Sequence, residues 1–354
     1  MNVSEFIIHI GTHKTGTTAI QNYLQANSRT LLRQGVLYIP HPQGHSALKN
    51  SDTLDETAAS RYRQYVSTTI NDTGRTGDKP LKVLLSWEGF SGSLIAGYTN
   101  AQAVVDNLQS AVSPLAERAR IIVYLRRQDH FLESVYSQKV HSGMTDRFES
   151  FLNKLPEDAF NWDLFLQAYE SKFGFDNVVP RIYDRRNLAT PSQHIEDFSQ
   201  LTDIADSAVP DDKSDAFSKV ANTGYAPEAL EALRLCNQVL SEEERVRVRR
   251  ILKKYAPKKS DYGSAFWTNS LQQRIASQHQ EGNIAVANRY PQLADGLQFD
   301  RSEIQDHDGS SIHSTAEAVS CLASALLAQL DERPRPLHKK VLRRLFSQLN
   351  SRSR

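Results

Sequence analysis

The sequence contains few cysteines and no excess of either charge. Its 354 residues include two cysteines, which are too few for a disulfide scaffold or a four-cysteine zinc site. Lysine and arginine total 42 and aspartate and glutamate total 41, so the formal net charge is +1. A protein that coats nucleic acid needs a basic surplus, so we expect no nucleic-acid partner, although local basic sites stay open.

Long hydrophobic runs and a secretion signal are also missing. No apolar stretch approaches the ~20 residues that span a bilayer, and the first residues lack the basic and apolar regions of a signal peptide. The scarcity of cysteine fits a reducing compartment, so we expect a cytoplasmic protein. With 39% hydrophobic and 23% charged residues, the chain has the composition of a folded protein with a sizeable core.

Strand and helix patterns alternate through the first half of the chain. Apolar stretches typical of buried strands occur at 6–10, 36–39, 81–86, 120–125 and 178–183. Helical periodicity lies between them, starting at Thr17 and then at 54–70, 101–112, 129–140 and 160–173, with Asp129 placed to cap its helix. This alternation predicts an α/β fold, a parallel sheet flanked by helices on both faces.

The second half of the chain has a different character. Residues 196–215 contain seven acidic residues and one lysine, which is typical of a solvated connection. Helices are expected near 226–240, 241–255 and 315–330, and no strand is expected there. We therefore predict a single α/β domain over 1–330, with its core at 1–200 and helical additions at 216–330, followed by a basic tail at 331–354.

A glycine-rich turn joins the first expected strand to the first expected helix. Such a turn presents backbone N–H groups and the positive end of the helix to an anion, usually a phosphate. The spacing of Gly11 and Gly16 is that of a nucleotide P-loop, but Thr17 stands where an ATP or GTP loop has its lysine. The lysine lies within the turn instead, at Lys14. The alternative is a tight turn with a surface lysine.

These residues resemble a known family. The segment Lys14-Thr15-Gly16-Thr17-Thr18 is similar to the 5′-phosphosulfate loop of sulfotransferases, whose donor is 3′-phosphoadenosine 5′-phosphosulfate (PAPS). The longer stretch 13–21 especially resembles the carbohydrate-type sulfotransferases of bacteria. The resemblance implies a P-loop-type fold, sulfuryl transfer to a hydroxyl of a carbohydrate, and no metal. It also implies that Lys14 contacts the sulfate and that Thr15, Gly16, Thr17 and Thr18 hold the 5′-phosphate.

The same resemblance implies a second anion site, for the 3′-phosphate of PAPS. The family places an arginine after a strand and a serine eight residues later, and Arg126 and Ser134 have that spacing here. A planar guanidinium suits the task because it can bond two phosphate oxygens at once. Arg127-Gln128 departs from the Asn-Pro that is more common in the family. The alternative is a strand that ends in surface arginines.

Sulfuryl transfer needs a base for the acceptor hydroxyl and a cation for the leaving oxygen. Glu88 directly follows the strand at 81–86, and ligands of parallel sheets gather beyond the carboxyl ends of the strands. The resemblance supports a glutamate in this role. His13, in the glycine turn, and His45, in the next loop, are the rival bases, because cytosolic small-molecule sulfotransferases use a histidine. The alternative for each of these histidines is a purely structural role.

Two basic segments have several interpretations. Residues 245–259 and 333–354 each contain eight lysines and arginines and no acidic residue. The first segment, with the aromatic residues that follow it, could complete the nucleotide site, bind an anionic acceptor or form a solvated helix face. The second could contact an anionic membrane or a partner, or pack on the body of the protein.

Two other functions compete with sulfuryl transfer. A P-loop kinase would need a lysine after Gly16 and a ligand for Mg²⁺, and the sequence offers Thr17 and no clear aspartate. A noncatalytic nucleotide- or glycan-binding protein would keep the phosphate groups and need no base. No motif in this sequence identifies the acceptor.

Overall fold

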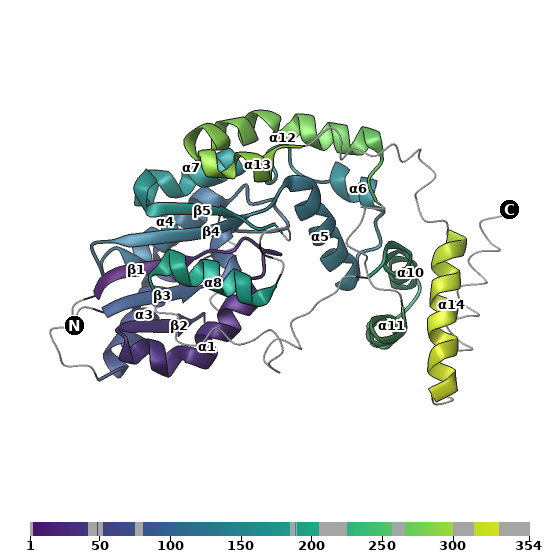
Figure 1. The fold of residues 1–354 in the computed structure, drawn as a ribbon, viewed down its shortest axis with the longest axis horizontal. Coiled ribbons are helices and arrows are strands. Elements are labelled where there is room, and N and C mark those ends of the chain that lie inside the picture. Colours follow the sequence, from purple (N-terminus) through teal and green to yellow (C-terminus); the bar gives the residue numbers. More distant parts are fainter. Residues whose placement is uncertain are drawn as a thin grey trace. The chain divides into compact units, whose positions relative to one another are not determined.

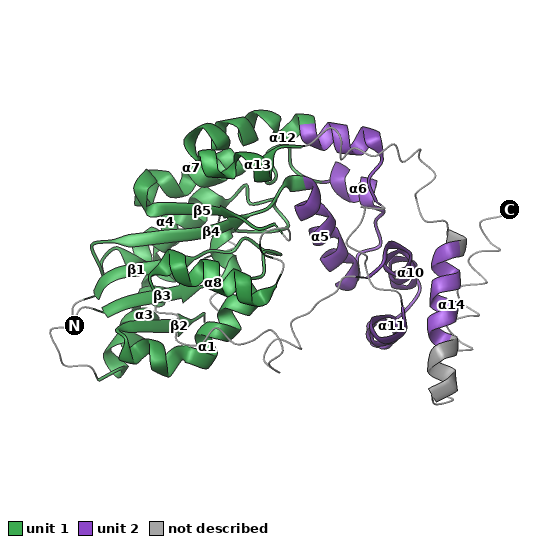
Figure 2. Cartoon of the chain, in the orientation of Figure 1, with its two compact units in different colours: residues 1–128, 155–221, 277–299 green, residues 129–154, 222–276, 300–354 purple. Residues whose placement is uncertain are grey.

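The computed structural model describes residues 3–41, 48, 52–74, 81–184, 188, 190–204, 225–256, 266–299 and 315–332. The chain divides into two compact units (Figure 2), the first formed by residues 1–128, 155–221 and 277–299 and the second by 129–154, 222–276 and 300–354. Compact units of this kind need not be separate domains, so the single domain over 1–330 and the tail at 331–354 stay predictions.

The first unit is built on a five-stranded parallel sheet (Figure 1). The strand order is β2-β3-β1-β4-β5, and Ile8 in the central strand is level with Leu85 on one side and Ile121 on the other. Because all strands are parallel, their carboxyl ends lie at one edge of the sheet. The strands are β1 (Val3–His9), β2 (Val36–Pro40), β3 (Leu81–Ser86), β4 (Ala119–Leu125) and β5 (Val178–Ile182).

Helices cover both faces of this sheet, which confirms the predicted α/β class. On one face, apolar side chains of α1 (Thr17–Arg33) and α8 (Pro191–Thr202), such as Ile20 and Phe198, form a core with Ile7 and Ile122 of the strands. The alternate strand residues, including Ile8, are buried on the other face. That face carries α3 (Glu56–Asp72), α4 (Ala101–Val112) and α7 (Trp162–Phe173).

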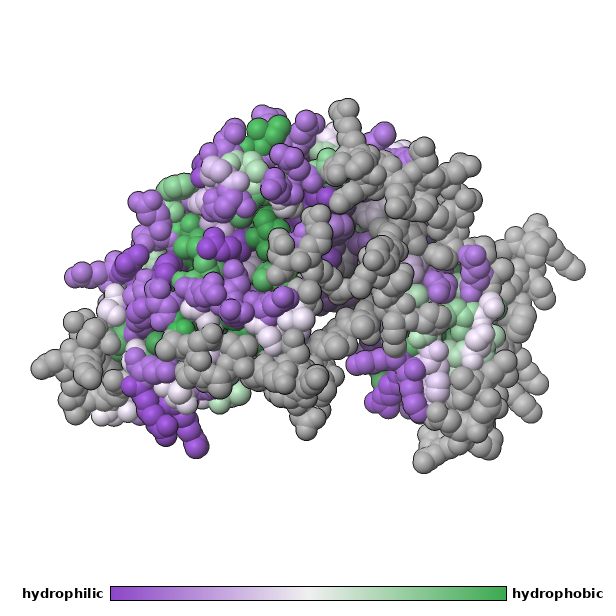
Figure 3. Space-filling model, in the orientation of Figure 1, coloured by the Kyte–Doolittle hydropathy of each residue, from purple (hydrophilic) through white to green (hydrophobic). Residues whose placement is uncertain are grey.

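Shorter elements complete the first unit, together with the last part of α12 (Asn269–Arg289). Arg289 of α12 bonds to Asp163 and lies 3.4 Å from Glu170, and both acids belong to α7. In Figure 3 the described surface is mostly hydrophilic, as expected when apolar residues are buried between layers. The short elements are η1 (Glu88–Ser91), η2 (Phe175–Asn177), η3 (Pro291–Leu293) and α13 (Ala294–Leu297).

The second unit is helical in its described part. Helix α10 (Pro227–Asn237) packs against α11 (Glu242–Tyr255) and α14 (Thr315–Glu332). The bounds of these helices are close to those of the three helices predicted in this half of the chain. Tyr136 of α5 (Gln128–His141), Phe148 of α6 (Phe148–Asn153) and the neighbouring Phe266 form an aromatic cluster. Among the described helices of the chain, none is long and apolar enough to cross a membrane.

Two expectations about local structure were wrong, and one helix was not predicted. The acidic stretch 196–215 was expected to be a solvated connection, but its first residues belong to a helix. Residues 191–202 form α8, which begins with a capping box at Thr190. The polar helix α12 was not expected, because its apolar residues do not form a clear stripe. Asp129 lies inside the first turn of α5 and not at its N-cap, and its carboxylate accepts the backbone N–H of His130.

Candidate functional site

The loops that follow β1 and β3 meet at the carboxyl edge of the sheet. Gly11 has a φ of 96°, and a Cβ atom on it would lie 3.4 Å from both Cα and Cγ of Glu88. The backbone N–H of Trp87 donates to the carbonyl of His9 at 3.0 Å. The turn also contacts the end of β4, because the backbone N–H of Thr12 donates to the carbonyl of Tyr124 at 3.0 Å. The structure therefore brings the predicted base beside the glycine turn.

Lys14 lies near charges of both signs at this edge. Lys14 is exposed, and its backbone φ is 65°. The protein around its ammonium lowers the pKa of Lys14 by desolvation, the positive charge of Arg126 lowers it further, and the carboxylate of Glu88 opposes both effects. Arg126 and Glu88 thus both lie near enough to Lys14 to act on its charge. Within the described part of the chain, Lys14 forms no ion pair.

The glycine turn is held by its own threonines. The hydroxyl of Thr15 donates to the carbonyl of Thr12 at 2.6 Å, and the hydroxyl of Thr17 reaches the same oxygen at 3.4 Å. Thr18 is exposed at the start of α1, whose first turn contains no acidic residue. A helix N-terminus without acidic side chains is suited to an anion because its N–H groups and its dipole are not neutralised. Contacts of Thr15, Gly16, Thr17 and Thr18 with a phosphate stay predictions.

A buried histidine that the sequence analysis missed lies under this turn. A Cβ atom on Gly16 would lie 2.7 Å from Nδ1 of His194 and 3.0 Å from the ring of Tyr183. Burial lowers the pKa of His194 to about 4, and its Nε2 has no hydrogen-bond partner among the described residues. His194 belongs to α8, just before the stretch expected to be solvated, and no local signal in the sequence pointed to it. The contact explains why residue 16 is glycine.

Glu88 begins η1 and is half-buried. The side-chain amide of Gln21, on α1, donates to Oε2 of Glu88 at 3.3 Å. Burial, and then the negative charge of Glu88, raise the pKa of Tyr38 to about 12. Within the described residues Glu88 forms no ion pair. A carboxylate that no cation neutralises directly is able to accept a proton from a bound hydroxyl.

His13 bonds to a buried tyrosine behind the turn. Oη of Tyr98 lies 2.7 Å from Nδ1 of His13 and accepts the backbone N–H of the same residue at 3.1 Å. The residue Tyr98 is 3% exposed, whereas His13 is half-buried. The sequence analysis missed Tyr98, which is 85 residues from His13 along the chain. His45, the other candidate histidine, lies outside the described residues.

Arg126 follows β4 and is half-buried. Its backbone carbonyl accepts a hydrogen bond of 3.0 Å from the indole Nε1 of Trp162, at the start of α7. The neighbouring Arg127 is buried, donates to the carbonyl of Gln298 and lies over the ring of Phe299. Ser134 is half-buried on α5 and belongs to the second unit. The pairing of Arg126 with Ser134 at one phosphate stays a prediction.

The described part of the first basic segment is a helix face in the second unit. Helix α11 buries Val248, Ile251 and Leu252 and exposes Arg250 on another side. The tryptophan that follows the segment, Trp267, is buried and packs against Phe148 in the aromatic cluster. These observations favour the solvated-face interpretation of residues 245–256. The basic tail at 333–354 lies outside the described residues.

No protein-family model matches this sequence, and no curated protein is significantly similar to it. Among solved structures, the chain is similar to a sulfotransferase from Alicyclobacillus acidocaldarius. The two chains are 15% identical, with a TM-score of 0.38, over 67% of this chain and 94% of that one. Similarity at this level does not by itself show a shared function.

Proposed function

We propose that this protein is a sulfotransferase that transfers a sulfuryl group from PAPS to a hydroxyl acceptor. The observation that supports it most is the grouping of Lys14, Glu88 and Arg126 around the glycine turn at the carboxyl edge of the sheet. A carboxylate grouped with two cations suits a reaction that removes a proton and releases a negatively charged leaving group.

The residues of the site fit a donor with a terminal anionic group. The N-terminus of α1 has no acidic residue in its first turn, and Lys14 has no ion pair among the described residues. Nε2 of His194, which has no hydrogen-bond partner among the described residues, is a further polar atom of the ring under the turn. In the proposal Thr15, Gly16, Thr17 and Thr18 hold the 5′-phosphate, and Arg126 and Ser134 hold the 3′-phosphate.

Bound PAPS would supply an activated sulfuryl group attached to a phosphate leaving group. In the proposed reaction the acceptor oxygen forms its bond to sulfur as the bond from sulfur to the bridging phosphate oxygen breaks. Glu88 takes the proton of the acceptor hydroxyl, and the ammonium of Lys14 balances the charge that develops on the bridging oxygen. The enzyme thus works with one base and one cation, and no metal is required in this scheme.

The acceptor in the proposal is a carbohydrate, which rests on the likeness of residues 13–21 to carbohydrate-type sulfotransferases. Trp87, which precedes Glu88, is half-buried and stacks on His41, and its accessible part is the aromatic surface that the proposal assigns to a sugar ring. Aromatic rings give apolar contact area together with a polar edge. A panel of glycans and small alcohols, incubated with PAPS carrying labelled sulfate, tests this part of the proposal.

Calorimetry with adenosine 3′,5′-bisphosphate and with ATP tests the donor site. We expect the bisphosphate to bind without Mg²⁺ and ATP to bind more weakly. Tight, Mg²⁺-dependent binding of ATP together with no binding of the bisphosphate would favour a kinase. Binding of the bisphosphate without transfer to any acceptor in the panel would favour a noncatalytic binding protein.

A further inference from the structure

The loop that carries Arg126 is held by bonds from three segments that are distant in the sequence. Nε1 of Trp162, at the start of α7, donates to the backbone carbonyl of Arg126 at 3.0 Å. The next residue, Arg127, is buried and donates at 3.3 Å to a backbone carbonyl of the segment that follows α13. Gln128, the first residue of α5, is fully buried and bonds to Asn283 of α12. Arg127 and Gln128 had no predicted role, and α12 was not expected.

The contact between Gln128 and Asn283 is a reciprocal pair of amides. Nε2 of Gln128 donates to Oδ1 of Asn283 at 2.8 Å, and Nδ2 of Asn283 donates to Oε1 of Gln128 at 3.0 Å. The same Nδ2 donates to the backbone carbonyl of Leu297 at 3.0 Å. A backbone carbonyl only accepts, so Leu297 fixes which atom of the Asn283 amide is the nitrogen, and the pair then fixes the amide of Gln128.

Burial makes the geometry of this amide pair hard to change. Gln128 is 0% exposed and Asn283 is 6% exposed, so water has little access to either amide. A buried donor or acceptor that loses its partner keeps the cost of desolvation, which exceeds the gain from an average hydrogen bond. A shift that separated the two amides would deprive buried polar atoms on both residues of their partners. The pair therefore favours one position of the loop between β4 and α5.

This loop lies at the proposed donor site. Arg126 directly follows β4, at the carboxyl edge of the sheet, and its positive charge acts on Lys14 of the glycine turn. Arg126, Lys14 and both members of the amide pair belong to the first compact unit. A shift of the loop would therefore change the separation of two cations that the proposed function assigns to one donor molecule. Small displacements of such groups are costly, because their interactions with a ligand depend on exact placement.

We propose that Gln128 and Asn283 are positioning residues, which fix the loop of Arg126 so that its guanidinium meets the 3′-phosphate of the donor. The inference rests on the proposed function, because it assigns a role within the proposed donor site. Both amides act through Arg126, since a guanidinium bonds two phosphate oxygens at once only in the correct position. Asn283, which is 155 residues from Gln128 along the chain, thereby determines the preference of the site for a nucleotide with a 3′-phosphate.

Calorimetry with two nucleotides tests this role in the full-length protein. Adenosine 3′,5′-bisphosphate and adenosine 5′-monophosphate differ only in the 3′-phosphate, so the ratio of their dissociation constants measures what that phosphate contributes. We expect Asn283→Leu to reduce the preference for the bisphosphate by about tenfold, the equivalent of one hydrogen bond to a charged group. Binding of the monophosphate should stay close to that of the wild type. An unchanged preference in the folded variant would overturn the proposal.

Asn107→Leu is the matched control for a purely structural effect. Asn107 of α4 is also a buried asparagine of the first unit, and its amide bonds to backbone groups of Thr53, Asp55 and Ala103. Its replacement should lower the free energy of unfolding, as that of Asn283 does, without a change in nucleotide preference. A preference that falls equally in both variants would show that lost stability is the cause, and the positioning role would be wrong.

A double-mutant cycle tests whether the two amides act as one unit. Gln128→Leu should reduce the preference for the bisphosphate as Asn283→Leu does. The double variant should lose no more than the larger of the two single losses, because the first substitution has already broken the pair. Additive losses would show that the two residues act independently and would contradict the proposal.

Hydrogen exchange in the wild-type protein decides the matter if the variants do not fold. The bisphosphate should slow amide exchange of α12 around Asn283 more than the monophosphate does, because the amide pair joins this helix to the loop of Arg126. Equal protection by both nucleotides would count against the pair. A wild-type protein without preference for the bisphosphate would overturn the proposed donor site and this role with it. A wild-type preference that survives in Asn283→Leu would remove the positioning role alone.

Discussion

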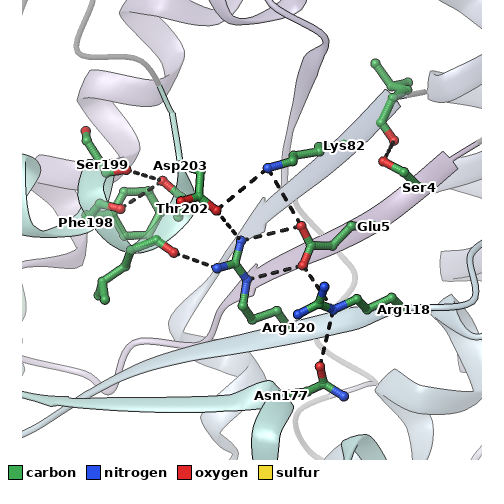
Figure 4. A network of polar contacts seen from close by, with 12 residues as sticks. Ser4, Glu5, Lys82, Arg118, Arg120, Asn177, Phe198, Ser199, Thr202 and Asp203 are labelled. Carbon is green, nitrogen blue, oxygen red and sulfur yellow. Dashed lines mark hydrogen bonds and ion pairs between the residues drawn. The ribbon is translucent and has the colours of Figure 1, made fainter. Parts of the chain in front are cut away.

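The two edges of the parallel sheet carry their charged residues in different ways. At the amino edge the carboxylate of Glu5, whose side chain is 9% exposed, lies within 4.0 Å of three cationic side chains (Figure 4). Two of these cations also lie within 3.9 Å of Asp203, which follows α8. The charges of this edge are therefore largely neutralised by one another. The three cationic residues are Lys82, Arg118 and Arg120.

At the carboxyl edge the charges are near one another but are not joined in the same way. Lys14 and Glu88 influence each other, yet neither forms an ion pair within the described part of the chain. Backbone contacts of Gly11 and the bonds of Tyr98 hold the loops in place instead. In the proposed function, this difference means that the amino edge contributes stability, while the carboxyl edge keeps charges available for a ligand.

Replacement of Glu88 by glutamine is expected to have the largest effect on activity. The amide keeps the size of the side chain and cannot accept the proton, so we expect kcat for sulfuryl transfer to fall by about 10² to 10⁴-fold. Binding of adenosine 3′,5′-bisphosphate, measured by calorimetry, should be unchanged. A turnover close to that of the wild type would show that Glu88 is not the base and would contradict the distinction between the two edges.

Replacement of Glu5 by glutamine is expected to act on stability instead. It removes the buried one of the two carboxylates beside the partly buried Arg120 and leaves the exposed Asp203, and we expect the free energy of unfolding to fall by about 2 to 3 kcal/mol in a urea titration. Asp203→Asn is the control, because the side chain of Asp203 is 69% exposed and should contribute less than about 1 kcal/mol. A fall in kcat without a loss of stability in Glu5→Gln would contradict the comparison.

The sequence was sufficient to predict most elements of the sheet, because each buried strand is a short apolar run bounded by turn residues. The strand at Leu81–Ser86 and the helix at Ala101–Val112 have the predicted bounds. Helix α12 was missed because its stability depends on partners distant in the chain, such as Asp163, which bonds to Arg289. Tertiary contacts of this kind leave no local pattern in a sequence.

The candidate site could be predicted where its residues directly follow a strand. Gly11, Glu88 and Arg126 do so, and parallel strands bring such positions to one edge. Tyr98 and His194 support the site from behind, and each is separated from the glycine turn by more of the sequence than any local motif spans. Their roles depend on burial and on the direction of hydrogen bonds, which become visible in three dimensions.

Alanine at position 16 tests how closely the carboxyl edge is packed. Gly16 has a φ of 80°, which costs other residues about 1 to 2 kcal/mol, and the added Cβ would also meet His194. We expect unfolding free energy to fall by more than about 2 kcal/mol and binding of the bisphosphate to weaken. Gly74→Ala is the control, because Gly74 has a φ of 62° with nothing within 4 Å of the added atom. Equal losses in both variants would show that the contact with His194 contributes nothing.

The last prediction concerns the buried imidazoles under the carboxyl edge. Burial and then the neighbouring His194 lower the pKa of His9 to about 3, and burial lowers that of His194 to about 4, from 6.5 in an unfolded chain. As the pH falls below 6.5, the unfolded chain therefore binds protons that the folded protein does not, and stability decreases until the pH reaches the folded values.

One pH unit below the unfolded value, we expect each of these two histidines to have lowered the free energy of unfolding by about 1.4 kcal/mol. Urea titrations between about pH 7 and pH 5 measure this slope. His194→Asn should be less stable at neutral pH, yet its slope should be shallower, because one titrating group has been removed. A wild-type stability that stays constant over this interval would mean that both imidazoles can be protonated in the folded protein. The groups buried under the carboxyl edge would then carry charge in the folded protein, as the groups at the amino edge do. The contrast between the two edges would not hold.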